Sequence, residues 1–441
     1  MGRYVPITPS EEREMLSAIG VDSLEALYES VPHDMLLKDG DLDLPAGKSE
    51  LEVRADVTNL AEQNTRFRTV LRGAGAYRHF IPAAVGSVVR REELVTAYTP
   101  YQPEISQGIL QSIFEYQTMI CQLTGMDVSN ASVYDGATAA AEATAMCKDR
   151  KRVKVYVSAC VHPQVLEVVK TYSFGSNTDV IVVPAKDGRT DTEALTGLLG
   201  ADAACFLLQQ PNYFGQVEDA EALGAIAHAA GAKFIMSVNP IAAALLPTPA
   251  ECGADVAVGE GQPLGMPLSF GGPYLGFMAA TNAMLRKLPG RIVGQTEDRE
   301  GRRGYVLTLS AREQHIRREK ASSNICSNEA LCALTAAVYM AAMGPDGMEQ
   351  AASLCTSKAH YLAQQLQSEA KLPLLYEGEF FHEFVTACKP ETAQAILDAL
   401  EAKGILGGQP VEGGLLWCAT ELVTKAEMDQ AVSIVKEVCG Q

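Results

Sequence analysis

The chain has 441 residues, enough for two to four domains at roughly 100–200 residues each, and it can bury a core without disulfide or metal support. Apolar residues make up 47% of it and charged residues 20%, which excludes a largely disordered chain. The formal net charge of −18 argues against partners such as nucleic acid and anionic membranes. Because no apolar stretch reaches the length of a transmembrane helix and the N-terminus lacks a secretory pattern, we expect a cytoplasmic protein.

The cysteines and histidines give no metal-binding pattern. The 11 cysteines are scattered and contain no C-x-x-C pair, and the histidines contain no H-E-x-x-H. Most of the cysteines lie in apolar context, as Cys121, Cys205 and Cys332 do. We therefore expect free, buried and reduced thiols and no metal.

The first 70 residues are predicted to be helical. Ser10 precedes the stretch EEREMLSAIG, and acidic residues in a first turn favour a helix start. A second helix is expected near residues 50–66, after a break around DGDLDLPAGKSE. This segment has the character of an extension that packs against something else.

A different pattern begins near residue 105. Residues 105–125 predict a buried amphipathic helix that ends at Gly125, and residues 220–230 predict another, closed by Gly231. Short apolar runs between and after these helices predict strands at 153–158, 179–184, 204–209, 233–238, 255–258 and 275–280. Buried strands spaced by helices indicate an α/β fold with a mostly parallel sheet, whose ligands usually bind at the carboxyl ends of the strands.

The C-terminal third combines a basic segment with a small domain. Residues 286–320 hold ten Lys or Arg against five acids, which is typical of a solvated loop or of a docking surface for an acidic partner. Strands in FFHEFVTAC and GGLLWCAT, and a capping box from Thr424 to Glu427, indicate an α+β unit. We expect three parts: a helical extension at 1–70, a large α/β domain at 71–325 and a small α+β domain at 326–441.

Three features are candidates for ligand binding, each with a structural alternative. In YDGATAAAEA, Gly136 allows close approach of a ligand, and the first-turn N–H groups of Asp135, Gly136, Ala137 and Thr138 can hold a phosphate; the alternative is a tight helix start against a sheet. The proline-punctuated segment with Tyr98, Tyr101, Gln102, Glu104 and Gln107 suits recognition of a small polar ligand, or it is only a connector. His162, at a strand end, could stack on a flat cofactor or be a satisfied structural histidine.

Six segments together resemble one family: LRGAGAYRHFIPAAV, YTPYQPEISQG, TGMDVSNASVYDGATAAAEA, QQPNYFGQVED, GEGQPLGMPLSFGGPYLGFMA and REQHIRREKASSNICSN. They look like the first subunit of the split glycine dehydrogenase (decarboxylating), the P-protein of the glycine cleavage system. The resemblance covers essentially the whole chain, in order. It implies the fold type I arrangement of pyridoxal phosphate (PLP) enzymes. It also implies that glycine is decarboxylated on PLP and that the aminomethyl group passes to the lipoyl arm of the H-protein.

One departure from an ordinary PLP enzyme changes this expectation. The fold needs a lysine for the Schiff base on a late loop, yet no lysine occurs between Lys233 and Lys287, and that loop reads GQPLGMPLSFGG. An acid is expected beside the pyridine nitrogen, whereas the strand end here reads SVNP, with Asn239 near that place. We therefore expect the non-lysine half of a two-subunit enzyme, with PLP held by the lysine-bearing partner in an α2β2 heterotetramer.

The resemblance gives the remaining residues provisional roles. The segment from Tyr98 to Gln107 is expected to reach into the partner's active site. The turn at Asp135–Thr138 is expected to be a remnant of a phosphate cup. Arg317 and Arg318 are expected to form a docking site for the acidic lipoyl carrier. Two other functions stay open. One is a self-sufficient PLP enzyme that uses Lys233 or Lys287, and the other is a non-enzymatic binding or regulatory protein on the same scaffold.

Overall fold

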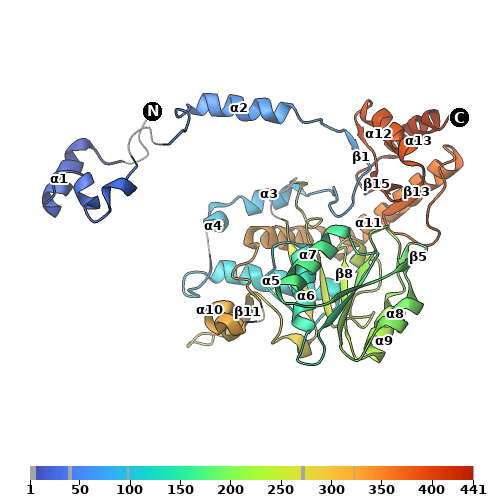
Figure 1. Cartoon of the computed structure of the whole chain (residues 1–441), viewed down its shortest axis with the longest axis horizontal. Coiled ribbons are helices and arrows are strands. Elements are labelled where there is room, and N and C mark those ends of the chain that lie inside the picture. The colour runs from blue at the N-terminus through green and yellow to red at the C-terminus, as the bar shows by residue number, and fades with distance from the viewer. Residues whose placement is uncertain (1–5, 38–41, 97–98, 270–273, 322, 441) are drawn as a thin grey trace. The chain divides into compact units, whose positions relative to one another are not determined.

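The computed structural model describes residues 6–37, 42–96, 99–269, 274–321 and 323–440 and divides them into two compact units, up to Arg66 and from Phe67 onward (Figure 1). The first unit contains α1 (Pro9–Ile19), two short 3-10 turns (Glu25–Tyr28 and His33–Met35) and α2 (Glu50–Glu62). The helix start expected at Ser10 comes slightly earlier, because Thr8 caps α1 and Pro9 is its first residue. The helix expected over 50–66 ends at Glu62.

The core of the second unit is a seven-stranded sheet in the order β2-β10-β9-β8-β7-β3-β4. Its strands are β2 (Val128–Ser129), β3 (Lys154–Ser158), β4 (Val180–Val183), β7 (Ala203–Gln210), β8 (Lys233–Val238), β9 (Val256–Glu260) and β10 (Gly276–Ala280). Pairing is parallel from β4 to β9, and β10 runs antiparallel to both β9 and β2. All six strands expected from the apolar runs are present.

Helices cover both faces of this sheet, as the alternation of buried side chains requires. Phe206, Leu208 and Phe234 face a core shared with α5 (Gln107–Thr124), α8 (Thr192–Leu198), α9 (Ala220–Ala229) and α11 (Ala330–Ser368). The alternating residues Leu207 and Ile235 face the opposite core, shared with α6 (Gly136–Cys147) and α7 (Pro163–Gly175). The strands are therefore buried on both sides (Figure 1).

The basic segment is not a plain loop. It contains an antiparallel hairpin of β11 (Ile292–Glu297) and β12 (Arg303–Thr308), followed by the short helix α10 (Gln314–Arg317). The hairpin packs against α5 through Val293 and Tyr305. The charge pattern hid these strands because the outer half of the hairpin is exposed and polar.

The C-terminal part has its own sheet and core. Strands β13 (Glu383–Ala387), β16 (Gly414–Cys418) and β15 (Gln409–Val411) form the sheet, with α12 (Pro390–Glu401) and α13 (Lys425–Val438) beside it. Thr424 and Glu427 form the expected capping box. The helix α11 is kinked at Gly344–Pro345 and contributes to both cores, so the domain boundary at 325/326 stays a prediction.

Several short elements complete the second unit. These are β1 (Thr69–Val70), β5 (Ala185–Lys186), β6 (Arg189–Thr190), β14 (Ile405–Leu406), α3 (Ala83–Val89) and α4 (Glu92–Val95). Strand β1 pairs in parallel with β14, far along the chain. Among the residues described, no helix is both long enough and apolar enough to cross a membrane.

Candidate functional site

A cavity of about 350 Å³ lies at the carboxyl edge of the large sheet. Gln209 near the end of β7, Asn239 after β8 and Glu260 at the end of β9 line it, as does the start of α6. The segment from Ala74 to Tyr77 and the start of β13 close its other side. The expected location of a ligand site, at the carboxyl ends of parallel strands, thus coincides with a cavity.

Glu260 is the acid that shapes the sheet side of this cavity. Its carboxylate accepts backbone N–H bonds from Gly136 at 3.0 Å, Gln262 at 2.9 Å and Leu275 at 3.0 Å. Burial raises the pKa of Glu260 to about 7, although these N–H bonds oppose the shift. A carboxyl group therefore holds the first turn of α6 close to the end of β9.

Glu383 and Tyr77 form the opposite wall. The Glu383 carboxylate accepts the N–H of Ala74 at 2.6 Å and the hydroxyl of Tyr77 at 2.7 Å. Burial raises the pKa of Glu383 to about 7. Next to it, His382 is 2% exposed, its ring lies 4.5 Å from that of Tyr77, and neither ring nitrogen has a hydrogen-bond partner. Burial lowers the pKa of His382 to about 3, so its ring is neutral near pH 7.

The turn at Asp135–Thr138 has the form expected of a phosphate cup but has carboxylate partners. The Asp135 carboxylate caps α6 by accepting the N–H of Thr138 at 2.7 Å, and Glu260 accepts that of Gly136. A Cβ atom at Gly136 would stand 2.7 Å from the backbone nitrogen of Glu260, so glycine is required by the close approach of helix and strand. Asp135, Gly136 and Ala137 line the cavity, whereas Thr138 lines a second hollow behind α6.

His162 lies at the mouth of the cavity and is tied to the backbone. It caps α7, since its Nδ1 accepts the N–H of Gln164 at 3.1 Å, and its Nε2 lies 2.9 Å from the carbonyl oxygen of Ala74. Burial lowers its pKa, so the ring is neutral. Its edge meets the ring of Tyr213 at 5.0 Å between centroids. Both of its nitrogens therefore serve the structure, and the stacking role stays a prediction.

The residues of this cavity do not fit PLP. None of the described residues that line it is a Lys or Arg, and two N–H groups of the turn that would hold a phosphate already bond to carboxylates. At the place of the expected acid, the Asn239 carbonyl oxygen accepts N–H bonds from Ile241 and Ala242, while its Nδ2 is buried without a partner. An anionic cofactor would meet acids here and no compensating cation.

The two alternative lysines are remote from this edge. Lys233 opens β8 at its amino end and pairs with Asp255 at 2.6 Å. Lys287 follows a 3-10 turn beyond β10 and donates to the carbonyl oxygen of Lys148 at 3.2 Å. Neither residue lines the cavity.

The segment proposed to contact a partner lies elsewhere. Tyr98 is outside the described residues. Tyr101 is exposed, and its hydroxyl accepts a hydrogen bond from Arg291 at 3.2 Å. Gln102 and Glu104 are exposed as well. Gln107 bonds through its amide to both backbone groups of Tyr305, which anchors the segment to β12. Tyr101, Gln102, Glu104 and Gln107, the described members of this set, do not line the cavity.

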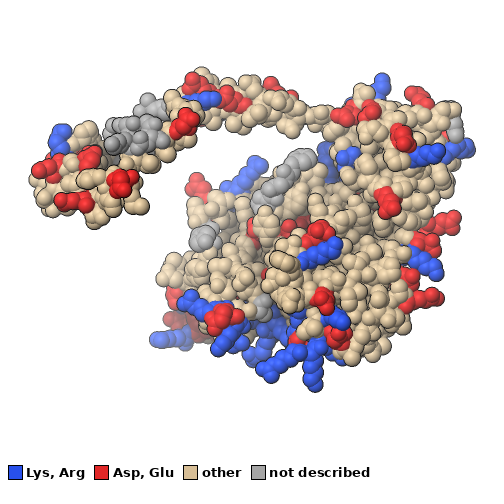
Figure 2. Space-filling view, in the orientation of Figure 1, with Lys and Arg blue, Asp and Glu red and all other residues tan. Residues whose placement is uncertain are grey.

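The basic segment divides into structural and exposed cations. Arg291 is buried against Tyr101, and Arg312 donates to the carbonyl oxygens of Leu288 and Gly290. Arg317 and Arg318 are exposed at the end of α10. Figure 2 shows Lys and Arg side chains gathered over the region that carries α10 and β11. An exposed basic surface is present, and its partner is a matter of proposal.

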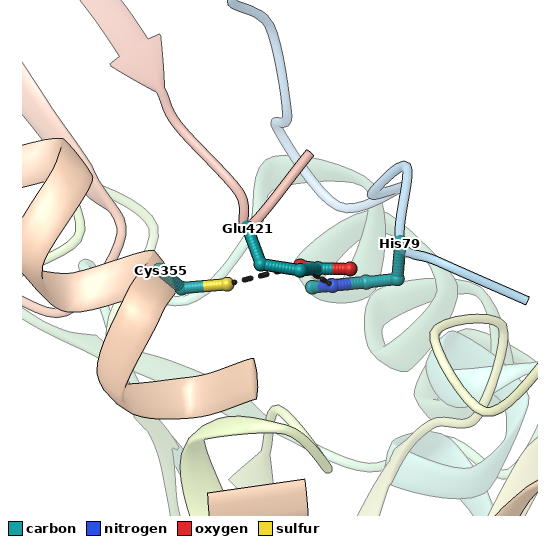
Figure 3. A group of neighbouring side chains, drawn as sticks. All are labelled: His79, Cys355 and Glu421. Carbon is teal, nitrogen blue, oxygen red and sulfur yellow. Dashed lines mark hydrogen bonds and ion pairs between the residues drawn. The ribbon is translucent and has the colours of Figure 1, made fainter. Parts of the chain in front are cut away.

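One buried group has metal-ligating residue types (Figure 3). The possible ligand atoms of His79, Cys355 and Glu421 all lie within 4.8 Å of one another. His79 Nδ1 is 2.7 Å from a Glu421 oxygen, whereas two ligands on one tetrahedral zinc ion stand roughly 3.3 Å or more apart. The Cys355 thiol donates to the same carboxylate at 3.3 Å, and burial raises the pKa of that thiol. Hydrogen bonds account for the group, which joins three distant segments.

Sequence reasoning missed the acids that matter most in this region. Glu260, Glu383 and Glu421 each stand beside buried strands or in Gly-rich segments, so a signal was present in GEGQPLG and FFHEF. What the sequence did not reveal is that the first two face each other across one cavity. That relation depends on β9 and β13, which are far apart in the chain, both reaching the same cavity.

Comparisons with known proteins point to one family over nearly the whole chain. The family profile described as "Glycine cleavage system P-protein" matches residues 2–435. A "Probable glycine dehydrogenase (decarboxylating) subunit 1" of Moorella thermoacetica is 49% identical and one of Desulfitobacterium hafniense is 46% identical, each with 99% of both chains covered. A crystal structure of an inhibitor-bound glycine decarboxylase (P-protein) matches with a TM-score of 0.93 and 40% identity, covering 99% of this chain and 100% of that one.

More distant structures confirm the fold alone. A C-DES mutant with glycine covalently linked to its PLP cofactor is 14% identical and matches with a TM-score of 0.62, covering 86% of this chain and 98% of that one. The large sheet and small domain therefore have the fold type I arrangement of PLP-dependent enzymes. The fold class and the family resemblance expected from the sequence are both confirmed.

Proposed function

The chain belongs to the glycine cleavage system P-protein family, and we propose that it is the non-lysine subunit of a glycine dehydrogenase (decarboxylating). With its partner it decarboxylates glycine and transfers the aminomethyl group to the lipoyl arm of the H-protein, in the degradation of glycine. PLP supplies the electron sink for this reaction when it is bound. We place the enzyme in the cytoplasm.

The observation that carries this proposal is the lysine-free carboxyl edge of the sheet. Asn239 stands near the place of the acid expected beside the cofactor's ring nitrogen, and Glu260 bonds to an N–H group of the turn that would hold the phosphate. Because this edge does not fit PLP, we assign the covalently held cofactor to a homologous, lysine-bearing subunit. Lys233, at the amino end of β8, gives no support to a self-sufficient enzyme.

The contribution of this chain to the shared site is proposed to be the segment from Tyr98 to Gln107. Gln107 fixes the segment to β12, and the Arg291 guanidinium lies 5.3 Å from the ring centre of Tyr101. These contacts hold the backbone while Gln102 and Glu104 stay exposed. A fixed segment with exposed polar side chains suits insertion into a neighbouring subunit's site.

The exposed apolar side chains of the first unit support the proposal of an obligate partner. Fourteen large apolar side chains of residues 6–66 are exposed, and Leu16 is the single buried residue within the described part of this unit. Exposed apolar surface of this extent is typical of an interface. We propose that the lysine-bearing subunit covers it, in an α2β2 assembly.

The exposed arginines Arg317 and Arg318 are proposed to guide the acidic lipoyl carrier. Opposite charges at a docking surface raise the association rate, and salt weakens that effect. Reversing both charges to Glu should lower carrier-dependent turnover and flatten its salt dependence. Unchanged turnover and unchanged salt dependence would contradict the docking role.

Absorbance and isotope exchange together test the main proposal. The purified chain with added PLP should show no visible band of a lysine-bound cofactor and no exchange of carbon dioxide into glycine. Exchange should appear when the lysine-bearing subunit is added. Exchange by this chain alone would overturn the proposal. An effect limited to modulating an already active partner would favour the second candidate, a regulatory protein on the same scaffold.

A further inference from the structure

The cavity at the carboxyl edge of the large sheet is lined by acidic side chains. Three carboxyl groups line it, those of Asp135, Glu260 and Glu383, and no Lys or Arg is among its lining residues. The two histidines on its wall are neutral, because burial lowers the pKa values of both His162 and His382. Burial raises the pKa values of Glu260 and Glu383 to about 7, and a bound cation would favour the ionised form of both, so the cavity favours a cation over an anion.

Its aromatic residues add to this preference. Tyr77, Tyr134 and Tyr274 line the cavity together with the acids. The faces of aromatic rings attract ammonium groups, and recognition of organic ammonium ions commonly combines such rings with carboxylates. Acids and tyrosines together thus indicate an organic cation rather than a neutral apolar ligand.

Two side chains on the wall have buried polar atoms without a hydrogen-bond partner among the described residues. His382 is 2% exposed, and both of its ring nitrogens are unbonded, while the Nδ2 of Asn239 is buried and unbonded. Buried polar groups are nearly always hydrogen-bonded, so these atoms are open to a partner that the chain does not supply, either water or a small polar molecule. The Asn239 amide can only donate from Nδ2, and it therefore requires an acceptor on that molecule.

We propose that this cavity binds a small primary ammonium ion that carries a neutral hydrogen-bond acceptor. The ammonium group lies among the three carboxyls, and the acceptor faces Asn239. A volume of about 350 Å³ admits a molecule of this size. Glycine itself is disfavoured because its carboxylate would face the acids, so the cavity is not a second substrate site.

Ethanolamine is the probe that meets these requirements. Titration calorimetry and saturation-transfer NMR on the full-length chain should show saturable binding of ethanolamine, with no binding of acetate or phosphate at the same concentration. Glu383→Gln should weaken binding at least fivefold, whereas Glu437→Gln, on the exposed face of α13, should leave it unchanged.

A second pair of variants keeps the test decisive if Glu383→Gln fails to fold. Gln164 is exposed at the mouth of the cavity. Gln164→Lys places a competing ammonium there and should abolish ethanolamine binding, while Gln164→Glu should preserve it, with unchanged melting temperature in both. No saturable binding, equal binding of phosphate, equal competition by potassium ions, or full binding by Gln164→Lys would each overturn the proposal.

Discussion

Residues 6–66 and residues 67–440 use apolar side chains in opposite ways. In the second unit, side chains such as Leu207, Phe234 and Trp417 are completely buried. In the first unit, Leu51 is 80% exposed and Leu60 64% exposed, although both lie on a regular helix. The second unit thus has the means to be stable by itself, whereas the first unit has helix caps but almost no core. The difference supports the proposal that the apolar surface of the first unit serves binding rather than folding.

The sharpest test of this comparison is removal of residues 2–66. We expect the shortened chain to unfold cooperatively near the original melting temperature, because its cores do not involve the removed residues. Association with the lysine-bearing subunit should weaken at least tenfold, which corresponds to about 1.4 kcal/mol. Calorimetry and ultracentrifugation measure the two effects. Loss of the cooperative transition would show that the first unit stabilises the fold.

The buried pair of His79 and Glu421 predicts the largest effect of a single side chain. Glu421→Gln removes a charge that accepts bonds from His79 and from the N–H of Phe80 at 2.6 Å. Breaking a buried pair costs about 3–5 kcal/mol, so urea unfolding should shift by an amount of this order. Glu62→Gln, on the exposed end of α2, should change stability by less than about 0.5 kcal/mol.

Matched leucine truncations compare the two units directly. Leu362 on α11 is fully buried, so Leu362→Ala should lower the free energy of unfolding by about 2–5 kcal/mol. Leu51→Ala should leave the isolated chain within about 0.5 kcal/mol of its original stability. If Leu51→Ala destabilised the isolated chain as much as Leu362→Ala, the first unit would have a core that its exposure does not indicate.

The acids of the second unit predict opposite pH effects. The folded-state pKa of Glu421 is about 2: burial raises it, but His79 and backbone N–H groups lower it further. Its contribution to stability is present above pH 4.5 and is lost as pH falls towards 2. Burial raises the pKa of Glu383 to about 7, so its contribution is present below pH 4.5 and is lost as pH rises through 7. Glu383→Gln should therefore reduce the loss of stability between pH 5 and 8 in thermal unfolding.

The smallest expected effect concerns a helix cap in the first unit. Ser49 and Glu52 form a capping box at the start of α2. Ser49→Ala should cost about 1 kcal/mol of local helix stability, seen as faster amide hydrogen exchange in α2. Exchange in β7 should stay the same, since β7 belongs to the other unit and we expect the two units to unfold independently. Faster exchange in both α2 and β7 would contradict that independence.

The sequence predicts the fold well where burial is periodic. The apolar runs at 204–209 and 233–238 correspond to β7 and β8, because a strand covered on both faces must be apolar throughout. The hairpin of β11 and β12 was not predicted, since its exposed charges mask the strand pattern. The capping residue of α1 was displaced by two positions, because Pro9 fits the first helical turn.

The sequence predicts the turn that helps to form the site, but it does not predict which side chains line the cavity. The spacing around Gly136 indicates a turn suited to close approach, which the distance to Glu260 explains. The carboxylate that occupies that turn comes from a separate strand, so no local pattern could identify it. His382 and Glu383 join the cavity only because the small domain closes on the sheet. Long-range pairing, rather than local propensity, decides the character of the cavity.

The pairing of β1 with β14 has a consequence for biosynthesis. Thr69 and Val70 lie beside Ile405 and Leu406, and Leu71 belongs to the same core as Trp417. At about 5–20 residues per second, a ribosome needs roughly 20–70 s after making β1 before β14 emerges. The large sheet can assemble during this interval, while β1 remains an unpaired apolar segment. Nascent chains of this protein are therefore expected to depend on a chaperone at that stage, and early termination should leave the large sheet folded while β1, which belongs to a separate two-stranded sheet, stays unpaired.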